Sequence, residues 1–463
     1  MNLSEEQKGI GRRNFLKAVA TLPALGAFTL TSTNTGPVKA GIVGTGMEGR
    51  ILIEAADPKY VNLIASCDIR PDNQVLGQQF IKKGGHSQNP KLYTNLDDML
   101  NDPEIEAVLI ATPIRMHGPM AIKALQAGKH VFTEKTMAYT IEECLEMIRL
   151  SKEKKLNLQV GHQRFYNPLY WDAYRMFKEG LLGSVYHVRA LWHRNADWNY
   201  WLHVLPEYRQ ALQKYDASKW GYKDPQHLVN WRWYSDTSHG LWTELCSHQM
   251  AITNWLFGDI TPSAVIASGG KYKKDKDQDD LYSTQSVEIQ QKRNYTTDDR
   301  DIPDHIYAIY EYPGGKTVTY SSIQSNGFDK YYEEIMGTHA TIILSNENEY
   351  YLFWEPGWDE TKAKDAAAGV QKATQVTVTQ EAANQSAFAA HVSAEATAGA
   401  ASGSTMSPTD PYKWELQGFA HTLRQNAPCL CDGARAARAA LACYKGKEAL
   451  DTKKRVEIQP LNV

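Results

Sequence analysis

Cysteine, net charge and long apolar runs are all scarce in this chain of 463 residues. Its six cysteines form no C-x-x-C pair, and Cys429-x-Cys431 is too close for that metal-ligand spacing, so we expect no metal site and at most one disulfide. A formal net charge of −3 gives no basis for binding nucleic acid or an anionic membrane. No apolar run is long enough to span a bilayer in the mature chain. The remaining class is a globular protein of two or three domains.

The N-terminus is similar to a targeting segment. Arg12-Arg13 precede Phe15-Leu16-Lys17 and an apolar run from Ala18 to Leu30, in the order of a twin-arginine export signal. The alternative is an ordinary basic amphipathic N-terminus. No cysteine follows the run closely and no clear A-x-A cleavage site is visible, so a lipid anchor is not indicated. We expect residues 1–35 to lie outside the fold and the protein to be exported to the periplasm.

A glycine-rich turn is the clearest local motif. The apolar run Val38 to Val43 leads into Gly44-Thr45-Gly46-Met47-Glu48-Gly49, a G-x-G-x-x-G followed by helix-forming residues. The first glycine provides a tight turn, the second lets backbone approach a pyrophosphate, and the third allows close packing of helix on strand. The pyrophosphate would lie at the helix N-terminus, where unpaired N–H groups favour an anion. The candidate cofactor-binding residues here are Gly44, Gly46, Met47 and Gly49.

An acidic residue follows at the expected distance. The apolar run Val61 to Cys67 ends in Asp68, which suits the acid that binds the adenosine ribose. Its carboxylate accepts hydrogen bonds from ribose hydroxyls and repels a 2′-phosphate, which favours NAD over NADP. Arg70 weakens this inference, because its guanidinium either pairs with a phosphate or is a solvated loop charge. NAD is the expected cofactor, and NADP stays open.

From residue 36 to 160, strand-like apolar runs alternate with helical stretches. This alternation is typical of a doubly wound parallel sheet, in which ligands bind at the carboxyl edge. The strand at Lys129 to Lys135 delivers a lysine to that edge, and the strand from Ala107 ends there in a turn. The further candidate cofactor-binding residues are Thr112, Pro113, His117, Glu134 and Lys135.

Beyond residue 161 the pattern becomes that of strands with one buried face, beginning with Val185 to Trp192. Strands without long intervening helices predict an antiparallel or mixed sheet. The segments 199–229, 270–303 and 355–410 exceed ordinary connections, and the last is a low-complexity insertion expected at the surface. The predicted fold class is therefore α/β, with an N-terminal Rossmann doubly wound parallel sheet (36–160) and a C-terminal α+β domain with an open, mostly antiparallel sheet (161–463).

The chain resembles the Gfo/Idh/MocA family of sugar and inositol oxidoreductases from about residue 38 to its C-terminus. The resemblance lies in the glycine turn with Asp68, Ala111-Thr112-Pro113 with His117, Glu134-Lys135, and Gly161-His162-Gln163-Arg164 followed by Asn167-Pro168. Family members commonly have Glu-Lys-Pro where this chain has Glu134-Lys135-Thr136. The resemblance implies a nicotinamide-dependent enzyme whose open sheet shields the nicotinamide and often forms a subunit interface, hence a homo-oligomer.

A helix in the second domain carries the candidate catalytic pair. Glu244 and His248 are four residues apart and therefore expected on one helical face. The family pattern adds an Asp three residues on, where this chain has Ala251. Oxidation of a secondary alcohol needs a group that takes the hydroxyl proton. We expect His248 to be the base, Lys135 to polarise the oxygen and Glu244 to orient one of them, although Lys135 and His248 can exchange roles. The alternative is a surface acid–histidine pair.

The chain is rich in aromatic residues, with 12 Trp and 25 Tyr, and sugar rings stack on flat aromatic faces. The segments Trp192 to Trp198 and Asn230 to Tyr234 interleave such faces with hydrogen-bonding groups, although aromatic residues at strand ends also serve as core. The candidate substrate-binding residues are Arg164, Tyr166, His193, Arg194, Trp231 and His239.

Three functions are open. The leading hypothesis is an exported NAD-dependent oxidoreductase that oxidises a secondary hydroxyl of a sugar or glycoside, with carbon 3 preferred and the cofactor tightly held. The second is a glycosidase that uses NAD catalytically, by oxidation, elimination, hydration and re-reduction. It needs a second base, for which Tyr166, His193 and His239 are candidates. The third is a non-catalytic sugar-binding protein with a structural dinucleotide. The presence of Lys135 and His248 argues against the third.

Overall fold

The structure is a computed structural model that describes residues 3–22, 36–196, 198–271, 299–374, 384–389 and 410–463. In the first domain the described strands form a six-stranded parallel sheet with the order β3-β2-β1-β4-β5-β6. They are β1 (Val38–Val43), β2 (Val61–Cys67), β3 (Lys91–Tyr93), β4 (Ala107–Ile110), β5 (His130–Glu134) and β6 (Leu158–Gly161). The strand order reverses between β1 and β4, which is where such sheets bind ligands.

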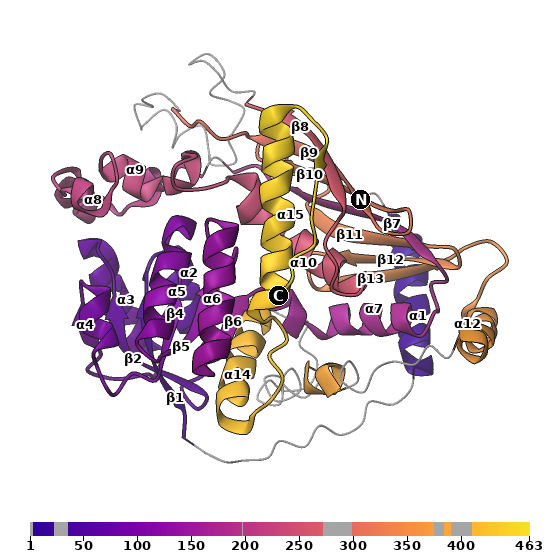
Figure 1. The fold of residues 1–463 in the computed structure, drawn as a ribbon, viewed down its shortest axis with the longest axis horizontal. Coiled ribbons are helices and arrows are strands. Elements are labelled where there is room, and N and C mark those ends of the chain that lie inside the picture. Colours follow the sequence, from indigo (N-terminus) through magenta and orange to yellow (C-terminus); the bar gives the residue numbers. More distant parts are fainter. Residues whose placement is uncertain (1–2, 23–35, 197, 272–298, 375–383, 390–409) are drawn as a thin grey trace.

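Helices cover both faces of this sheet (Figure 1), which is why strands such as β4 are buried along their whole length. The helices are α2 (Met47–Ala55), α3 (Pro71–Lys83), α4 (Leu96–Leu100), η1 (Ile114–Met116), α5 (His117–Gln126) and α6 (Ile141–Lys154). The start of α6 is set by a capping box, because Thr140 and Glu143 each accept a hydrogen bond from the other's backbone N–H.

The second domain is built on a mixed sheet in which the described strands have the order β13-β12-β11-β7-β10-β9-β8-β14. Neighbouring strands are antiparallel except for the parallel pair β7 and β10. The strands are β7 (Val185–His193), β8 (Ala264–Gly270), β9 (His305–Tyr312), β10 (Lys316–Ile323), β11 (Tyr331–Gly337), β12 (Ala340–Ser345), β13 (Glu349–Trp354) and β14 (Val456–Glu457). The predicted fold class is confirmed.

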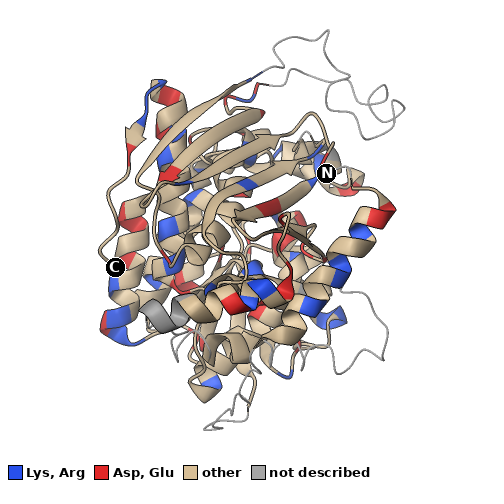
Figure 2. Ribbon diagram, turned by 90° about the vertical axis from the view of Figure 1, so that its right-hand side faces the viewer, with Lys and Arg blue, Asp and Glu red and all other residues tan. Residues whose placement is uncertain are grey.

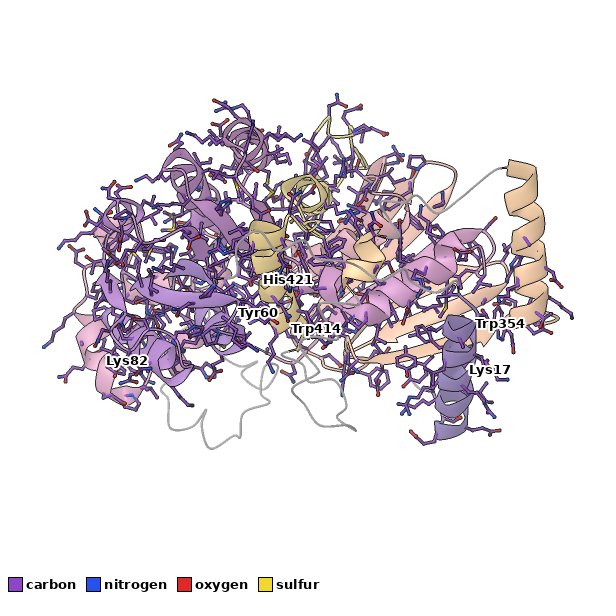
Figure 3. All side chains as sticks on the ribbon, turned by 90° about the horizontal axis from the view of Figure 1, so that it is seen from below. Lys17, Tyr60, Lys82, Trp354, Trp414 and His421 are labelled. Carbon is purple, nitrogen blue, oxygen red and sulfur yellow. The ribbon has the colours of Figure 1, made fainter. Side chains whose placement is uncertain are left out.

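Several helices of the second domain connect or cover the two sheets. α15 packs against α6 of the first domain and against α10 and β8 of the second, and it stands between the domains in Figure 1. α14 reaches the first domain, where the ring of His421 lies 5.3 Å from that of Tyr60 (Figure 3). The helices are η2 (Gln163–Tyr166), α7 (Pro168–Lys178), η6 (Trp242–Cys246), α10 (Ser247–Leu256), α14 (Asp410–Gln425) and α15 (Gly433–Thr452).

The N-terminal residues differ from the expectation that 1–35 lie outside the fold. Helix α1 (Glu5–Thr21) packs along β13, the edge strand of the second sheet. Phe15 is 1% exposed with its ring 4.5 Å from that of Tyr350, and Asn14 Nδ2 donates to the Leu352 carbonyl at 3.2 Å. Figure 3 shows Lys17 of α1 and Trp354 of β13 at the same end of the molecule. The helix thus covers a strand edge that would otherwise present unpaired backbone groups.

The long segment 199–229 folds into short helices that lie over the first domain (Figure 1). It is anchored there because Tyr215 Oη donates to the Ile69 carbonyl at 2.6 Å and Arg115 Nη2 donates to the Gly221 carbonyl at 3.3 Å. The helices are η3 (Tyr200–His203), α8 (Pro206–Gln213), η4 (Ala217–Trp220), α9 (Pro225–Val229) and, just beyond it, η5 (Trp231–Trp233).

The other two long segments are described only in part. Of 270–303, residues 272–298 lie outside the described residues, as do 375–383 and 390–409 of the predicted insertion at 355–410. Within that insertion, α12 (Glu360–Thr374) is a helix.

Figure 2 shows acidic and basic residues interspersed on the face in view, in keeping with the small net charge. No described helix has the length and apolar character needed to cross a membrane.

Candidate active site

A cavity of about 720 Å³ opens at the carboxyl ends of β1, β2, β4 and β5. Its far wall comes from residues between 200 and 232 and from Glu244 of the second domain. The predicted residues on its wall are Gly44, Gly46, Met47, Asp68, Thr112, Pro113, His117, Glu134, Lys135, Trp231 and Glu244. The structure therefore brings most of the predicted cofactor-binding residues together around one space.

The glycine turn fits a dinucleotide. A Cβ on Gly49 would lie 2.0 Å from the Gly44 carbonyl oxygen, so Gly49 is fixed by packing of α2 on the turn. Gly44 has φ +84°, a conformation that favours glycine. At Gly46, by contrast, a Cβ would meet only Asn73 Nδ2 at 3.9 Å, so the space over this residue is open toward the cavity. That is the place where the motif leaves room for a pyrophosphate at the N-terminus of α2.

The ribose-binding position is also preformed. Asp68 is buried, and its carboxylate accepts hydrogen bonds from Thr45 N at 2.7 Å and Arg70 N at 2.8 Å. The Arg70 guanidinium is engaged by Asp72, with Nε to Oδ1 at 3.2 Å and Nη2 to Oδ2 at 2.5 Å. Arg70 is therefore paired within its own loop and is not a free, solvated charge.

The turns after β4 and β5 are tied together beside the cavity. The buried ring of His117 lies between the carbonyl oxygens of Thr112, at 2.8 Å, and Thr136, at 2.9 Å. Glu134 accepts from Lys135 N at 3.1 Å, and burial together with the nearby Glu48 raises the pKa of Glu134 well above its ordinary value. These contacts fix the backbone from which Lys135 extends.

Lys135, Glu244 and Arg232 form the polar centre of the site. Lys135 Nζ donates to the Glu244 carbonyl oxygen at 3.0 Å, and Arg232 Nε donates to Glu244 Oε2 at 2.7 Å. Burial opposes ionisation of Glu244, but the charges of Arg232 and Lys135 outweigh it and hold its pKa below the ordinary value. Arg232 was missed as a site residue by the sequence analysis, although it lies within the aromatic segment Asn230 to Tyr234 that was noted there.

Glu244 and His248 lie where the helix geometry changes. Residues Trp242–Cys246 make a π-helical turn, and α10 begins at Ser247. Glu244 pairs with Arg232, whereas the ring of His248 packs 6.0 Å from that of His162 and 5.0 Å from that of Trp192. Single π-helical turns are frequent at functional sites.

His248 and His162 are two buried imidazoles. Burial, followed by the charges of Lys135 and Arg164, lowers the pKa of His162 to about 3 and that of His248 well below its ordinary value. Nδ1 of His248 and both ring nitrogens of His162 have no hydrogen-bond partner among the described residues. Both rings are therefore neutral at pH 7. His162 belongs to the family motif but was not among the predicted site residues, and its position directly after the parallel strand β6 was the signal that could have indicated it.

Four predicted substrate-binding residues are placed elsewhere, and their assignment is corrected. Arg164 is 1% exposed and pairs with Glu333 and, at 2.8 Å, with Glu347. Tyr166 is fully buried, with Oη accepting from Leu430 N at 3.3 Å.

The two histidines are likewise occupied. His193 has Nε2 2.9 Å from Ser321 Oγ and Nδ1 3.2 Å from the Phe328 carbonyl. His239 has Nε2 2.8 Å from the Tyr139 carbonyl, and its ring stacks on Tyr139 at 4.1 Å. Arg164, Tyr166 and His193 contact other parts of the second domain, His239 contacts Tyr139 of the first domain, and none of the four lines the cavity described above.

Of the two other predicted substrate-binding residues, Trp231 lies on the cavity wall and Arg194 does not. Trp231 lines the cavity, with the Arg232 guanidinium 4.2 Å from its ring centre. Arg194 lies at the end of β7 with its guanidinium 5.0 Å from the ring of Trp198. Among the described residues, no group of three or more His, Cys, Asp or Glu side chains is placed to hold a metal ion.

The fold and this site define an NAD-binding oxidoreductase. A model described as "Oxidoreductase family, NAD-binding Rossmann fold" matches residues 38–162, and one described as "Oxidoreductase family, C-terminal alpha/beta domain" matches residues 212–445. The two ranges cover more than half of the 463 residues, and the chain belongs to the Gfo/Idh/MocA oxidoreductase family. The resemblance seen in the motifs and the expectation of an NAD cofactor are confirmed.

Curated relatives match part of their own length. An uncharacterized oxidoreductase of Streptococcus pneumoniae is 26% identical over 266 residues, which is 55% of this chain and 60% of that protein. Inositol 2-dehydrogenase of Salmonella typhimurium is 31% identical over 183 residues (39% and 51%), and a glycosyl hydrolase family 109 protein of Shewanella pealeana is 29% identical over 191 residues (39% and 41%). The chain thus spans less than two thirds of each of these relatives.

Solved structures share the fold along most of both chains. A levoglucosan dehydrogenase in complex with NADH and levoglucosan has a TM-score of 0.63 at 17% identity, covering 91% of this chain and 99% of that one. The WlbA dehydrogenase from Bordetella pertussis in complex with NADH and UDP-GlcNAcA has a TM-score of 0.62 at 17% identity, covering 91% and 98%.

Proposed function

We propose that this protein is an NAD-dependent oxidoreductase that oxidises a secondary hydroxyl of a sugar or glycoside, with carbon 3 as the preferred position and the cofactor retained between turnovers. The observation that carries the proposal is the fixed amino group of Lys135 beside Glu244 at the edge of the cofactor cavity. The relatives that are named for inositol and levoglucosan support a polyhydroxylated ring as substrate.

The residues present divide the chemistry between them. Bound NAD would supply the hydride acceptor, with Gly46, Asp68 and the turn residue Thr112 on the wall of its cavity. Lys135 Nζ donates one hydrogen bond to the Glu244 carbonyl and keeps further N–H groups for a substrate oxygen. His248 does not line the cavity, and its unprotonated ring has a lone pair for the hydroxyl proton, although its lowered pKa makes it a weaker base than a free imidazole.

Glu244 acts through its neighbours. Its carboxylate is held by Arg232 and its carbonyl by Lys135, so one residue positions both cations relative to each other. This arrangement differs from the expected one, in which the Glu244 carboxylate itself orients the base. Lys135 and His248 stay exchangeable as the group that takes the proton.

The second candidate function is a glycosidase that uses NAD catalytically. Similarity to the glycosyl hydrolase family 109 protein favours it. Its mechanism requires a second base, and Tyr166, His193 and His239 are all hydrogen-bonded elsewhere. The neutral ring of His162, next to His248, is the group left for that role. A non-catalytic sugar-binding protein with a structural dinucleotide is the third candidate, and the site residues Lys135 and His248 argue against it.

The test is turnover without an added electron acceptor. Purified protein is incubated with a panel of glycosides while cofactor absorbance and product masses are followed. One equivalent of reduced cofactor with a product two mass units lighter supports the dehydrogenase, and repeated release of free sugar supports the glycosidase. Lys135→Ala should abolish both, whereas Lys152→Ala, at an exposed lysine on α6 that does not line the cavity, should not. Full turnover by Lys135→Ala would contradict the proposal.

We also propose export and self-association. Both Arg12 and Arg13 are exposed on α1, where a translocation receptor can reach them. Replacing both with Lys should keep the protein in the cytoplasm, as judged by cell fractionation. For a homo-oligomer, the support is an apolar patch on the outer face of the second sheet, where Ile266 and its cross-strand neighbour Ile309 are 45% and 47% exposed. Light scattering of the purified protein tests it.

A further inference from the structure

Arg194 is a half-buried guanidinium without an ionic partner among the described residues. It follows the end of β7 and lies between two aromatic rings, 6.0 Å from the centre of Trp192 and 5.0 Å from that of Trp198. Its backbone N–H donates to the Ile323 carbonyl at 2.9 Å, which fixes the start of the side chain. Its Nε is buried and has no hydrogen-bond partner among the described residues.

Three other largely buried arginines of the second domain pair with carboxylates, and a fourth, Arg300, donates to the side-chain oxygen of Gln324 at 2.9 Å. Arg164 contacts the carboxylates of Glu333 and Glu347, Arg232 that of Glu244, and Arg435 that of Asp259 at 3.0 Å. Removing water from a guanidinium is costly, and a nearby carboxylate usually offsets that cost. Arg194 has no ion pair with a described carboxylate to offset that cost. Burial lowers its pKa, but the guanidinium stays charged at any physiological pH. A ligand anion would complete the pair.

Arg194 lies near the proposed base His248, with the ring of Trp192 between them. The ring of Trp192 lies 5.0 Å from that of His248 and 6.0 Å from the Arg194 guanidinium, so one aromatic side chain separates the base from the cation. Arg194, Lys135 and Arg232 all act electrostatically on Glu244.

The charges at this end of the site do not balance. Lys135, Arg232 and Arg194 are positive, and Glu244 and the cavity-lining Glu48 are the carboxylates that act on them. Burial raises the pKa of Glu134, and the rings of His162 and His248 are neutral, so one positive charge is left over. A bound nicotinamide in its oxidised form adds another positive charge. The excess favours a negative group on the molecule that enters.

We propose that the substrate is an anionic sugar and that Arg194 binds its negative group while the sugar ring lies near Lys135 and His248. This inference rests on the proposed oxidoreductase function. A carboxylate is the better match, because a guanidinium presents two parallel N–H groups in its plane, but a sulfate ester offers the same charge. Trp192 and Trp198, which flank the guanidinium, hold it in one orientation.

The experiment compares matched sugars. Methyl hexosides of the gluco, galacto and manno series are each prepared in neutral form, as the 6-carboxylate and as the 6-sulfate, so that only the charge at carbon 6 changes. Reduction of bound NAD and quenching of tryptophan fluorescence are measured for the wild type, Arg194→Gln, Arg194→Lys and the control Arg189→Gln. Arg189 lies on the same strand, is half exposed and pairs with Glu334 at 3.6 Å.

In at least one series, the wild type should prefer an anionic form over the neutral one by about 100-fold in kcat/KM, and Arg194→Gln should reduce that preference to within about threefold. Arg194→Lys should keep more of the preference for the sulfate than for the carboxylate, because an ammonium group is a point charge. Arg189→Gln should behave as the wild type. The form that the wild type prefers, carboxylate or sulfate, identifies the negative group that Arg194 binds.

Two outcomes separate this inference from the function on which it rests. If neutral sugars reduce bound NAD as well as the anionic forms do, or if Arg194→Gln keeps the preference, the inference is overturned and the oxidoreductase function stands. If anionic forms bind in an Arg194-dependent manner but no sugar reduces the cofactor, the binding site stands and the proposed function fails.

Discussion

Arg232 and Glu244 form a buried ion pair across the mouth of the cofactor cavity, with Nε 2.7 Å from Oε2 and side-chain exposures of 19% and 9%. The pair joins η5 to the π-helical turn before α10, and the Glu244 carbonyl in turn holds Lys135. The geometry of the proposed catalytic lysine therefore depends on an arginine more than 90 residues away in sequence.

Arg232→Gln should be costly for both stability and rate. Breaking a buried pair leaves the other charge uncompensated, so we expect a loss of about 3 kcal/mol in the free energy of unfolding at pH 7, measured by denaturant titration. The pKa of Glu244 is held down in the folded state, so the pair stabilises above the ordinary carboxyl pKa, and this contribution fades as pH falls through the folded-state value.

The double variant Arg232→Gln, Glu244→Gln is the control. It removes both charges and should be more stable than Arg232→Gln alone, because no unpaired carboxylate remains. Additive losses in the double variant would show that the two side chains do not interact.

The two glycines of the cofactor turn should respond differently to alanine. At Gly49 the added Cβ would lie 2.0 Å from the Gly44 carbonyl oxygen, so Gly49→Ala should lower the free energy of unfolding by about 3 kcal/mol without ligand. At Gly46 the Cβ meets only Asn73 Nδ2 at 3.9 Å, and φ is −64°, so Gly46→Ala should fold normally. We expect Gly46→Ala to lose the thermal shift that NAD gives the wild type. A normal NAD shift in this variant would place the pyrophosphate elsewhere.

The parts of the site that local patterns govern were accessible from sequence. A strand, a glycine turn and an acidic residue at this spacing occur in a single structural arrangement. Gly46 and Asp68 could therefore be placed at the carboxyl edge of a parallel sheet from the sequence alone. Lys135 could be placed by the same reasoning, because β5 is parallel to its neighbours and the residue that follows it lies at the carboxyl edge of the sheet.

Tertiary contacts decided the rest. Arg164 has the motif position of a site residue, but two carboxylates from β11 and the turn after β12 occupy it, and no local pattern reveals such partners. The spacing of Glu244 and His248 did not reveal their partners, because Arg232, His162 and Trp192 come from other elements. Arg232 joined the site through a contact with Glu244 in another element of the second domain, and His162 through its proximity to Lys135 of the first domain.

Helix α1 provides a separate prediction, on the full-length chain. Phe15 and Ala18 are buried, and a Cβ on Gly11 would lie 2.8 Å from the Cβ of Tyr351, so the helix is fitted to β13. Phe15→Ala should lower the free energy of unfolding by about 3 kcal/mol, whereas Leu16→Ala, with Leu16 55% exposed, should change it little. Equal effects of the two substitutions, measured by thermal unfolding, would show that α1 does not pack on the sheet.

The buried imidazoles of His162 and His248 make stability depend on pH in a defined direction. Both have folded-state pKa values below the ordinary one, to about 3 for His162, whereas in the unfolded chain each takes up a proton near pH 6.5. Below that pH the unfolded state binds more protons than the folded state, so the free energy of unfolding falls as pH falls, by about 1.4 kcal/mol per pH unit for each histidine.

His162→Asn should therefore have a shallower loss of stability between pH 6.5 and 5 than the wild type, by about 2 kcal/mol over that interval. Urea titrations at four pH values measure it, and His203→Asn, at an exposed position, is the matched control and should follow the wild type. If the curves of wild type and His162→Asn run parallel, the pKa of His162 is the same in the folded and the unfolded chain, and burial does not hold the ring neutral. Such a ring would still be mostly unprotonated at pH 7 and able to accept a substrate proton, so this result would bear on the burial of His162 and not on its role as second base.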